Sequence, residues 1–423
     1  MKFEQVLPVL ALLGCVFITI LDLAVGITGF ASLTACTIFM CIILYPYRNT
    51  SLGSITLFSG TSLYIVAYAA LLTVGELVNI AWFALFILVA YAMLASTVDP
   101  VTLENRGQRT EERSASVGNL ALLPIILATA FAMSTLLSGT IAELSIGVGW
   151  AVSMLMLERL HWSTPSLFKR LVGASLIIVY LLVYAAFFWG GGGRLAFISL
   201  LLAPILLISY YGPWRVNGFV LAGLGAALVF VGRVMRFGWS NGLAGVAEDS
   251  GATHVGLTSE LWRVPSLTGS ATNLWEQYLL LFVNWLPREW WPGKPLGANY
   301  VFVDVYIGRE GLGEEHSTAL GYFGEHIYYS QDFWILGVVL TTVTIIALRR
   351  LLAKLSGPYI TPVLMLDVWL LTLFWGGMAV FGSRLWFSLL PTLGLAVFLR
   401  WWGGRSTKQH RRSAGALARR EAA

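Results

Sequence analysis

The sequence predicts an all-α polytopic membrane protein with about twelve transmembrane helices and one long extramembrane loop. Of its 423 residues, 57% are hydrophobic and only 12% are charged, whereas a typical soluble domain carries about 25% charged residues. Apolar runs of about 20 residues, the length that crosses the hydrocarbon of a bilayer, follow one another along the chain. One polar stretch, residues 233–332, interrupts them. The polar chemistry of this membrane protein is therefore expected in that stretch.

The apolar runs divide the chain into four parts. Residues 1–232 contain the first nine predicted spans, residues 233–332 form the long loop, residues 333–402 contain the last three spans, and residues 403–423 form a basic tail. The predicted spans are residues 6–25, 28–45, 54–73, 77–96, 116–136, 139–157, 171–189, 195–211, 216–232, 333–348, 362–381 and 385–402. The first apolar run continues past Cys15, which favours a transmembrane helix over a cleaved signal peptide.

The distribution of basic residues predicts the orientation of these spans. If the N-terminus is cytoplasmic, most of the 27 lysines and arginines fall in cytoplasmic links or in the tail. The short links on the other side contain only Arg194 and Arg384. Both termini are therefore expected in the cytoplasm and the long loop outside. The basic excess is a topology signal together with a tail that can rest on anionic lipid, and no basic groove for nucleic acid is visible.

The sequence contains no recognisable metal or cofactor motif. Its three cysteines fall inside apolar runs without metal-ligand spacing. His316 and His326 are ten positions apart, unlike the i, i+4 pair of a zinc helix. An Asp-x-Asp pair, which could hold a divalent ion on a sugar nucleotide, is also absent. We therefore expect no metal and no cofactor.

The first half of the long loop has two features of interest. Arg233 and Arg236 share one helical face, where they can clamp a phosphate or reach toward lipid headgroups. Residues 273–286 are apolar and aromatic but too short to span a membrane. They predict a helix along the membrane interface, whose aromatic face either guides a lipid tail or packs against the bundle.

Residues 286–295, Leu-Pro-Arg-Glu-Trp-Trp-Pro-Gly-Lys-Pro, form the segment that we call the proline loop. Three prolines in nine residues disfavour helix and sheet pairing, so we expect a stiff, extended backbone. Such a frame displays Arg288 and Lys294 at low entropic cost. Trp290 and Trp291 offer ring faces for sugar stacking or for the membrane interface. The alternative is an aromatic membrane anchor with cations that reach toward the headgroups.

Two further segments follow the proline loop. Residues 299–307 alternate in polarity and predict a short strand or the entry into a helix, with Tyr300 and Tyr306 as candidate contacts to sugar or lipid. The densest titratable cluster comes next, at residues 314–318, and a second acid–histidine pair follows at residues 325–326 in a segment expected to be helical. Carboxylates and imidazoles can act as a general base on a hydroxyl where their surroundings tune the pKa.

The proline loop, residues 316–318 (His-Ser-Thr) and residues 324–326 (Gly-Glu-His), followed by a return into the membrane, resemble the bacterial O-antigen polymerases, also called oligosaccharide repeat unit polymerases. Members of that family often carry a proline-arginine, aromatic-proline, lysine-proline run in a late periplasmic loop, before a glycine-glutamate stretch. The motif covers about 40 residues, and the architecture agrees along the chain. The chain departs from many members because Glu325 and His326 stand where a tyrosine-asparagine-phenylalanine type of continuation is common.

The resemblance implies a GT-C-like glycosyltransferase of the bacterial inner membrane. Such an enzyme transfers a growing glycan from one polyprenyl diphosphate to the next lipid-linked repeat unit at the periplasmic face. The sugar donor is already on lipid, so the enzyme needs no nucleotide. The implied partners are a polyprenyl-diphosphate-linked oligosaccharide, membrane lipids, and the flippase and chain-length regulator of the same pathway.

This chemistry assigns expected roles to the polar residues of the loop. Departure of a lipid diphosphate needs cations that stabilise its developing charge. The first candidates are Arg288, Lys294 and Arg309, and the second set is Arg233, Arg236 and Arg384. The acceptor hydroxyl needs a base, for which Glu315 and His316 are the first candidates and Glu325 and His326 the alternates.

Three other functions are compatible with the same architecture. An O-antigen ligase uses the same donor but transfers the glycan to lipid A core. A transporter or flippase needs ionisable residues within its spans, and Asp22, Glu143 and Asp367 lie near span ends. A nonenzymatic scaffold for a polysaccharide complex would tolerate loss of the loop charges.

Overall fold

The computed structural model describes residues 139–163, 175, 178–179, 182, 194–211, 274–306, 320–330 and 334–421. In these ranges all regular structure is helical and no strand is present, which confirms the all-α class. The helices are α8 (Gly139–Ser163), α10 (Arg194–Tyr211), α14 (Leu274–Val283), α15 (Ala298–Tyr306), α16 (Gly321–Ser330), α17 (Trp334–Ser356) and α18 (Thr361–Glu421). The spans predicted before residue 139, the span at residues 216–232 and most of that at residues 171–189 lie outside the described residues.

Three of the predicted spans can be compared directly with helices. The runs at residues 139–157, 195–211 and 333–348 correspond to α8, α10 and α17. Both α8 and α17 continue past the predicted C-terminal end, through charged residues at which the apolar run stops. Arg349 of α17 is buried and pairs with Asp367 of α18, with 3.0 Å between Nε and Oδ1. The helix continues because this charge is neutralised by a residue distant in sequence.

Helix α18 consists of two antiparallel arms joined at Gly377, which has φ +81° and ψ −175°. The side chain of Trp369 in the first arm donates a hydrogen bond of 2.7 Å to Ser388 in the second. Two spans were expected here, with a link at residues 382–384, so the predicted position of the link is wrong. Glycine adopts a positive φ without the steric cost that other residues incur, which locates the bend at Gly377. Arg384 therefore lies within the second arm.

Two helical segments within the described ranges, Leu336–Ser356 and Gly376–Trp402, are long and apolar enough to cross a membrane. One face of α17 exposes a series of large aliphatic side chains. They are Leu336, Val339, Leu340, Val343, Leu351 and Leu355. A helix that exposes such a face is suited to contact with lipid.

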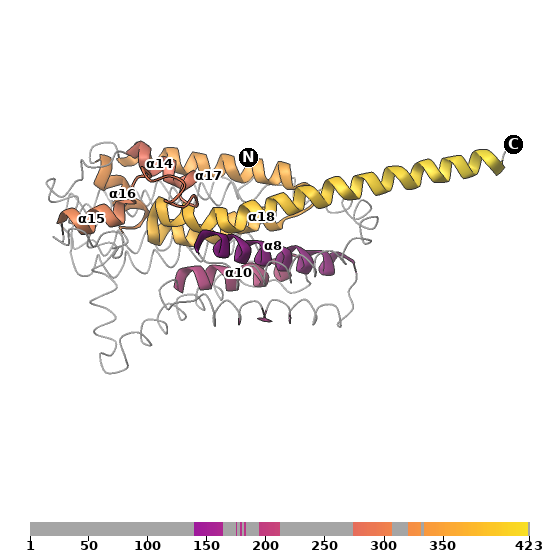
Figure 1. The fold of residues 1–423 in the computed structure, drawn as a ribbon, viewed down its shortest axis with the longest axis horizontal. Helices are drawn as coiled ribbons and strands as arrows, with labels where there is room; N and C mark the ends of the chain where they lie inside the picture. Colours follow the sequence, from indigo (N-terminus) through magenta and orange to yellow (C-terminus); the bar gives the residue numbers. More distant parts are fainter. Residues whose placement is uncertain are drawn as a thin grey trace, which may run out of the picture.

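The two arms of α18 form the centre of the described bundle (Figure 1). Helices α8 and α10 pack on one side of the hairpin and α17 on the other. Helices α14, α15 and α16 gather at the end of the bundle that contains the Gly377 bend. The last turns of α18 extend beyond the opposite end.

A buried glutamate caps the start of α18. Glu158 of α8 accepts hydrogen bonds from the backbone N–H groups of Ile360 and Thr361, at 2.7 and 3.2 Å, and from the Thr361 hydroxyl. The next residue, Arg159, donates to the Tyr359 hydroxyl. A carboxylate at this position satisfies free donors of the first turn and interacts favourably with the helix dipole. Glu158 thus connects α8 to the end of the hairpin farthest from the bend.

Candidate functional site

The site at the bend begins with α14, which packs closely on the second arm of α18. Trp386 donates to the carbonyl of Leu281 at 2.8 Å, and Asn284 donates to the carbonyl of Ala379 at 2.6 Å. A side chain at Gly382 would overlap the α14 backbone, since its Cβ would lie 2.7 Å from the Leu281 oxygen. The approach of α14 to α18 therefore depends on a glycine in the second arm.

The two faces of α14 have different surroundings. The face toward the bundle buries Gln277, Leu280 and Leu281. The opposite face exposes Trp275, Leu279 and Phe282. The expected helix is confirmed and one of its faces packs against the bundle. A role of the exposed face in guiding a lipid tail stays a prediction.

The proline loop folds into successive turns, so the predicted extended backbone is wrong. The N–H groups of Trp290 and Trp291 donate to the carbonyl of Pro287, each at 3.2 Å. The N–H of Lys294 donates to the carbonyl of Trp291 at 3.0 Å. Proline is compatible with the first position of a turn because the N–H that it lacks has no partner there. The prolines therefore limit the length of the turns without preventing them.

Both cations of the proline loop point toward its own backbone. Lys294 Nζ donates to the carbonyls of Asn284 and Leu286, at 2.7 and 2.8 Å. Arg288 donates to the carbonyls of Lys294 and Pro295, at 2.8 and 3.3 Å. Burial, and then the neighbouring Arg288, lower the pKa of Lys294 to about 8, while Glu289 opposes the shift. Arg288 and Lys294 therefore brace the loop and close the C-terminal end of α14.

Gln277 fastens the far end of the same segment. Its amide nitrogen donates to the carbonyl of Leu296 at 2.9 Å, and its amide oxygen accepts from the N–H of Ala298 at 3.1 Å. Ala298 is the first residue of α15, so this contact caps that helix. The predicted strand at residues 299–307 is wrong and the alternative, a helix entry, is confirmed. Tyr300 is half-buried on α15.

Glu325 of α16 is fully buried at the bend of α18. Its Oε2 accepts a 2.5 Å hydrogen bond from the N–H of Met378, the residue after Gly377. A Cβ at Gly377 would overlap the Glu325 carboxyl group. Burial raises the pKa of Glu325 to about 8, against the opposing effect of the Met378 contact. Within the described structure Oε1 has no hydrogen-bond partner.

His326 is also fully buried but faces α17. Its Nε2 lies 3.3 Å from the hydroxyl of Thr341, which lies 2.7 Å from the hydroxyl of Tyr278. Tyr278 donates its hydrogen to the carbonyl of Gly337 at 2.5 Å. Thr341 can thus donate to Tyr278 and accept from His326, which assigns the ring hydrogen to Nε2.

The imidazole of His326 lies against a glycine, as the Glu325 carboxyl does. A Cβ at Gly337 would lie 2.6 Å from its Nδ1, and burial lowers the pKa of His326 to about 3, so the ring is neutral. Two consecutive side chains of α16 therefore reach different neighbours, the bend of α18 and the first turn of α17. In this arrangement they hold helices together and neither reaches the surface.

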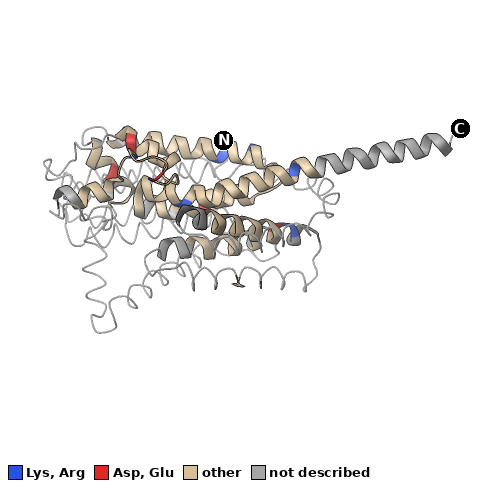
Figure 2. Cartoon of the chain, in the orientation of Figure 1, with Lys and Arg blue, Asp and Glu red and all other residues tan. Residues whose placement is uncertain are grey.

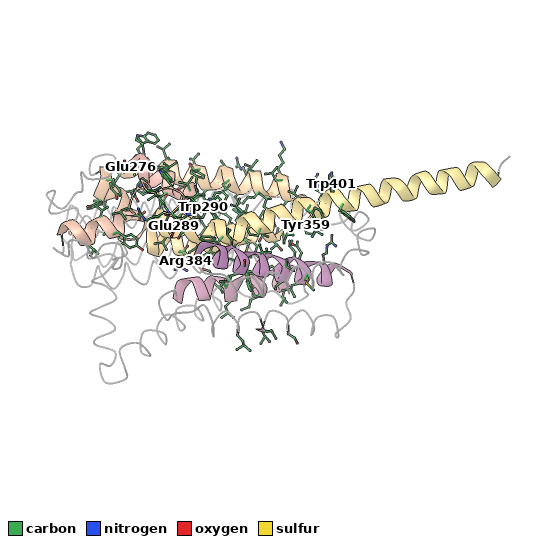
Figure 3. All side chains as sticks on the ribbon, in the orientation of Figure 1. Glu276, Glu289, Trp290, Tyr359, Arg384 and Trp401 are labelled. Atoms are coloured by element: carbon green, nitrogen blue, oxygen red, sulfur yellow. The ribbon has the colours of Figure 1, made fainter. Side chains whose placement is uncertain are left out.

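Among the candidate cations that the structure describes, Arg384 is available for a ligand. It is half-buried in the second arm of α18 and makes no hydrogen bond or ion pair with any described residue. Figure 3 labels Arg384, Glu289 and Trp290 in the part of the bundle near α14, α15 and α16. Trp290 is exposed and Trp291 is half-buried. The structure thus places the proline loop and Arg384 at the same end of the bundle.

The remaining candidates lie beyond what the structure describes. They are Arg233, Arg236, Arg309, Glu315 and His316, together with the side chain of Tyr306. Within the described part of the chain, no group of three or more His, Cys, Asp or Glu side chains could hold a metal ion.

Several structural residues of the site were not predicted from the sequence. Gly337 and Gly377 resemble any other glycine in an apolar run, and Tyr278 and Thr341 resemble ordinary helix residues. Their importance comes from partners far along the chain. Comparisons of the chain with protein families, with curated proteins and with solved structures found no match.

Proposed function

We propose that this protein is a lipid-linked oligosaccharide repeat unit polymerase of the bacterial inner membrane. The observation that carries the proposal is the packing of α14 and Asn284 on the second arm of α18. The proline loop follows directly after Asn284, at the end of helices long enough to cross a membrane. This packing brings an exposed indole, an exposed carboxylate and half-buried cations to one end of an apolar bundle. A lipid-linked glycan likewise combines an apolar polyprenyl chain with a diphosphate and sugars.

The distribution of charge supports the proposed orientation. Figure 2 shows acidic residues near α14, α15 and α16, and most of the basic residues toward the other end of the bundle. Arg349, Arg350, Lys354 and Arg400 belong to the segments near that other end. Basic residues favour the cytoplasmic side. The end that contains the proline loop is then periplasmic and both termini are cytoplasmic.

The proposed reaction moves a glycan between two lipid carriers. The acceptor hydroxyl attacks the anomeric carbon of the growing glycan, a new C–O bond forms, and the bond to the diphosphate oxygen breaks. The hydroxyl proton passes to a base, and the polyprenyl diphosphate leaves with the electron pair. Cations near the diphosphate stabilise the charge that develops on it.

Arg384 is the described cation best suited to this role, because its guanidinium makes no contact with a described partner. Arg288 and Lys294 have donors that the loop carbonyls do not occupy, and the loop holds both in fixed positions. Arg309, Arg233 and Arg236 stay candidates for the same diphosphate. Such preorganisation increases the effect of each charge on the barrier.

The base is assigned to Glu315 or His316. Glu325 and His326 are fully buried against Gly377 and Gly337, so we assign them to positioning the helices that carry the cations. Asp367, one residue that transport could use, is paired with Arg349. The Asp367 carboxylate therefore serves to hold α17 and α18 together. A structural role for this residue favours the polymerase over the transporter.

The test uses a strain in which the gene is deleted and restored on a plasmid. Arg384→Ala should stop glycan elongation and leave single lipid-linked repeat units, because loss of one stabilising contact typically costs about 3–4 kcal/mol in the barrier. Arg384→Lys should retain part of the activity. Arg400→Ala is the matched control, since Arg400 is an exposed arginine of the same helix, 16 residues after Arg384.

The readout is the length distribution of lipid-linked and surface glycans, with protein level measured in the membrane. Full-length glycans on the lipid carrier that fail to reach lipid A core would instead identify a ligase. Repeat units trapped at the cytoplasmic face would identify a flippase. Normal chain lengths in the deletion strain would refute all three.

A further inference from the structure

The tip of the proline loop exposes a different chemistry from the one that its composition suggests. The cations point inward to backbone carbonyls, and the four exposed residues of the loop are Glu289, Trp290, Pro292 and Gly293. Trp290 has 64% of its surface exposed. A carboxylate and an indole are therefore the functional groups that the tip presents.

The frame behind these two side chains is rigid. Lys294 and Arg288 together hold four backbone carbonyls between residues 284 and 295, and Gln277 fixes the residues that follow. Asn284 connects the base of the loop to Ala379 of α18. A ligand that binds at the tip therefore has little backbone motion to suppress, which reduces the entropic cost of binding.

The pair of groups has the chemistry that recognises a sugar. An indole face offers a flat apolar surface for the C–H face of a pyranose ring. A carboxylate accepts hydrogen bonds from neighbouring hydroxyl groups, and charge-assisted bonds of this kind are stronger than neutral ones. The side chains of Glu289 and Trp290 make no hydrogen bond or ion pair with described residues, so both retain their capacity for a ligand.

A tryptophan at the membrane interface is the competing role for Trp290. The neighbouring Glu289 carboxylate argues against it, because a charged group loses hydration when the same tip enters the membrane interface. The flanking exposed residues, Pro292 and Gly293, add no large apolar side chain. The tip therefore fits a polar, ring-shaped ligand better than a bilayer surface.

We propose that Glu289 and Trp290 form a carbohydrate-binding subsite for a sugar of the lipid-linked glycan. The identity of the glycan rests on the proposed function, but binding by this subsite does not require transfer. Trp290 stacks on the sugar ring, and Glu289 accepts hydrogen bonds from the hydroxyl groups of the same sugar. Arg288 and Lys294 brace the loop behind them.

The experiment measures binding with the full chain in lipid nanodiscs. The probe is the soluble oligosaccharide released by mild acid from the lipid carriers of the deletion strain. Trp290→Ala should weaken binding about tenfold, the equivalent of 1.4 kcal/mol, and Trp290→Phe should weaken it less. Glu289→Ala and Glu289→Gln should both weaken it, because each removes the charged acceptor. Trp401→Ala is the control, since Trp401 is an exposed tryptophan toward the other end of the bundle (Figure 3).

Unchanged affinity in the Trp290→Ala and Glu289→Ala variants overturns the subsite. A second measurement tests the competing role by brominated acyl chains in the nanodisc, which quench tryptophans at the bilayer. A smaller total quenching in Trp290→Phe than in the wild type would place Trp290 at the bilayer and also overturns it. The deletion strain reports separately on the proposed function. Elongation with no tip-dependent binding refutes the subsite alone, and tip-dependent binding without elongation refutes the polymerase alone.

Discussion

Replacement of Gly377 by alanine should destabilise the α18 hairpin. The backbone at this residue has φ +81°, a conformation that a residue with a Cβ adopts only at a cost. The added methyl group would also overlap the carboxyl of Glu325. Relief of that overlap would require Glu325 to move away from the N–H of Met378, its hydrogen-bond donor. The substitution thus disturbs both the bend of α18 and the hydrogen bond that joins it to Glu325 of α16.

The expected cost follows from two separate terms. The combination of φ +81° and ψ −175° is open essentially only to glycine and costs another residue about 1–3 kcal/mol. Overpacking of a filled site typically costs a further 1–3 kcal/mol, to about 2–6 kcal/mol in all. Gly394→Ala is the matched control, because it lies in the second arm with nothing within 4 Å of its Cβ. There, alanine should stabilise the helix by about 0.5–1 kcal/mol.

The assay is the apparent melting temperature of the purified protein in detergent, compared at one heating rate because unfolding of such proteins is commonly irreversible. Gly377→Ala should melt several degrees below the wild type and Gly394→Ala should not. In the double variant Gly377→Ala with Glu325→Ala, the overlap is relieved but the backbone strain remains. The double variant should therefore regain only the part of the stability that the overlap had cost. A Gly377→Ala variant that melts like the wild type would refute the hairpin geometry. A double variant with no recovery relative to the sum of the single changes would refute the Glu325 contact.

Two further predictions concern the same end of the bundle. Burial raises the pKa of Glu325 from 4.5 to about 8, so the folded protein retains a proton that the unfolded chain loses, and stability should fall as pH rises from 4.5 to about 8. Glu325→Gln should flatten this part of a melting-temperature profile against pH. A variant that keeps the wild-type slope contradicts the assignment. Lys294→Met removes both carbonyl contacts of the side chain, so hydrogen exchange should accelerate at residues 280–295. The exposed Lys354→Met should leave that region unchanged, and equal exchange in both variants would show that Lys294 does not brace the loop.

The apolar pattern was a good guide to where helices form. Residues 195–211 were predicted as a span and form α10 almost without change. The prediction failed where α17 passes Arg349, because sequence hydropathy treats a charge as the end of an apolar run. Asp367, in another helix, removes that penalty. Such compensation depends on a tertiary contact and is not visible in the local sequence.

The candidate site likewise has some features that the sequence shows and others that depend on tertiary contacts. The sequence identified Glu325 and His326 as titratable residues in a helical segment, but their burial could not be read from it. Burial follows from two glycines, Gly377 and Gly337, that lie beside them only in the folded chain. The prediction of a link at residues 382–384 was wrong for a related reason. Its polarity suggested a turn, while the backbone turned at the glycine that α16 could approach.

The sequence alone determined that this protein is helical, rich in membrane-length apolar runs, and interrupted by one polar loop with a proline-rich centre. These properties follow from composition and from spacing along the chain, which local physics can read. Only the tertiary structure decided which way the side chains of that loop point. Arg288 and Lys294 turn inward because four backbone carbonyls need donors there, and Glu289 and Trp290 are left at the surface.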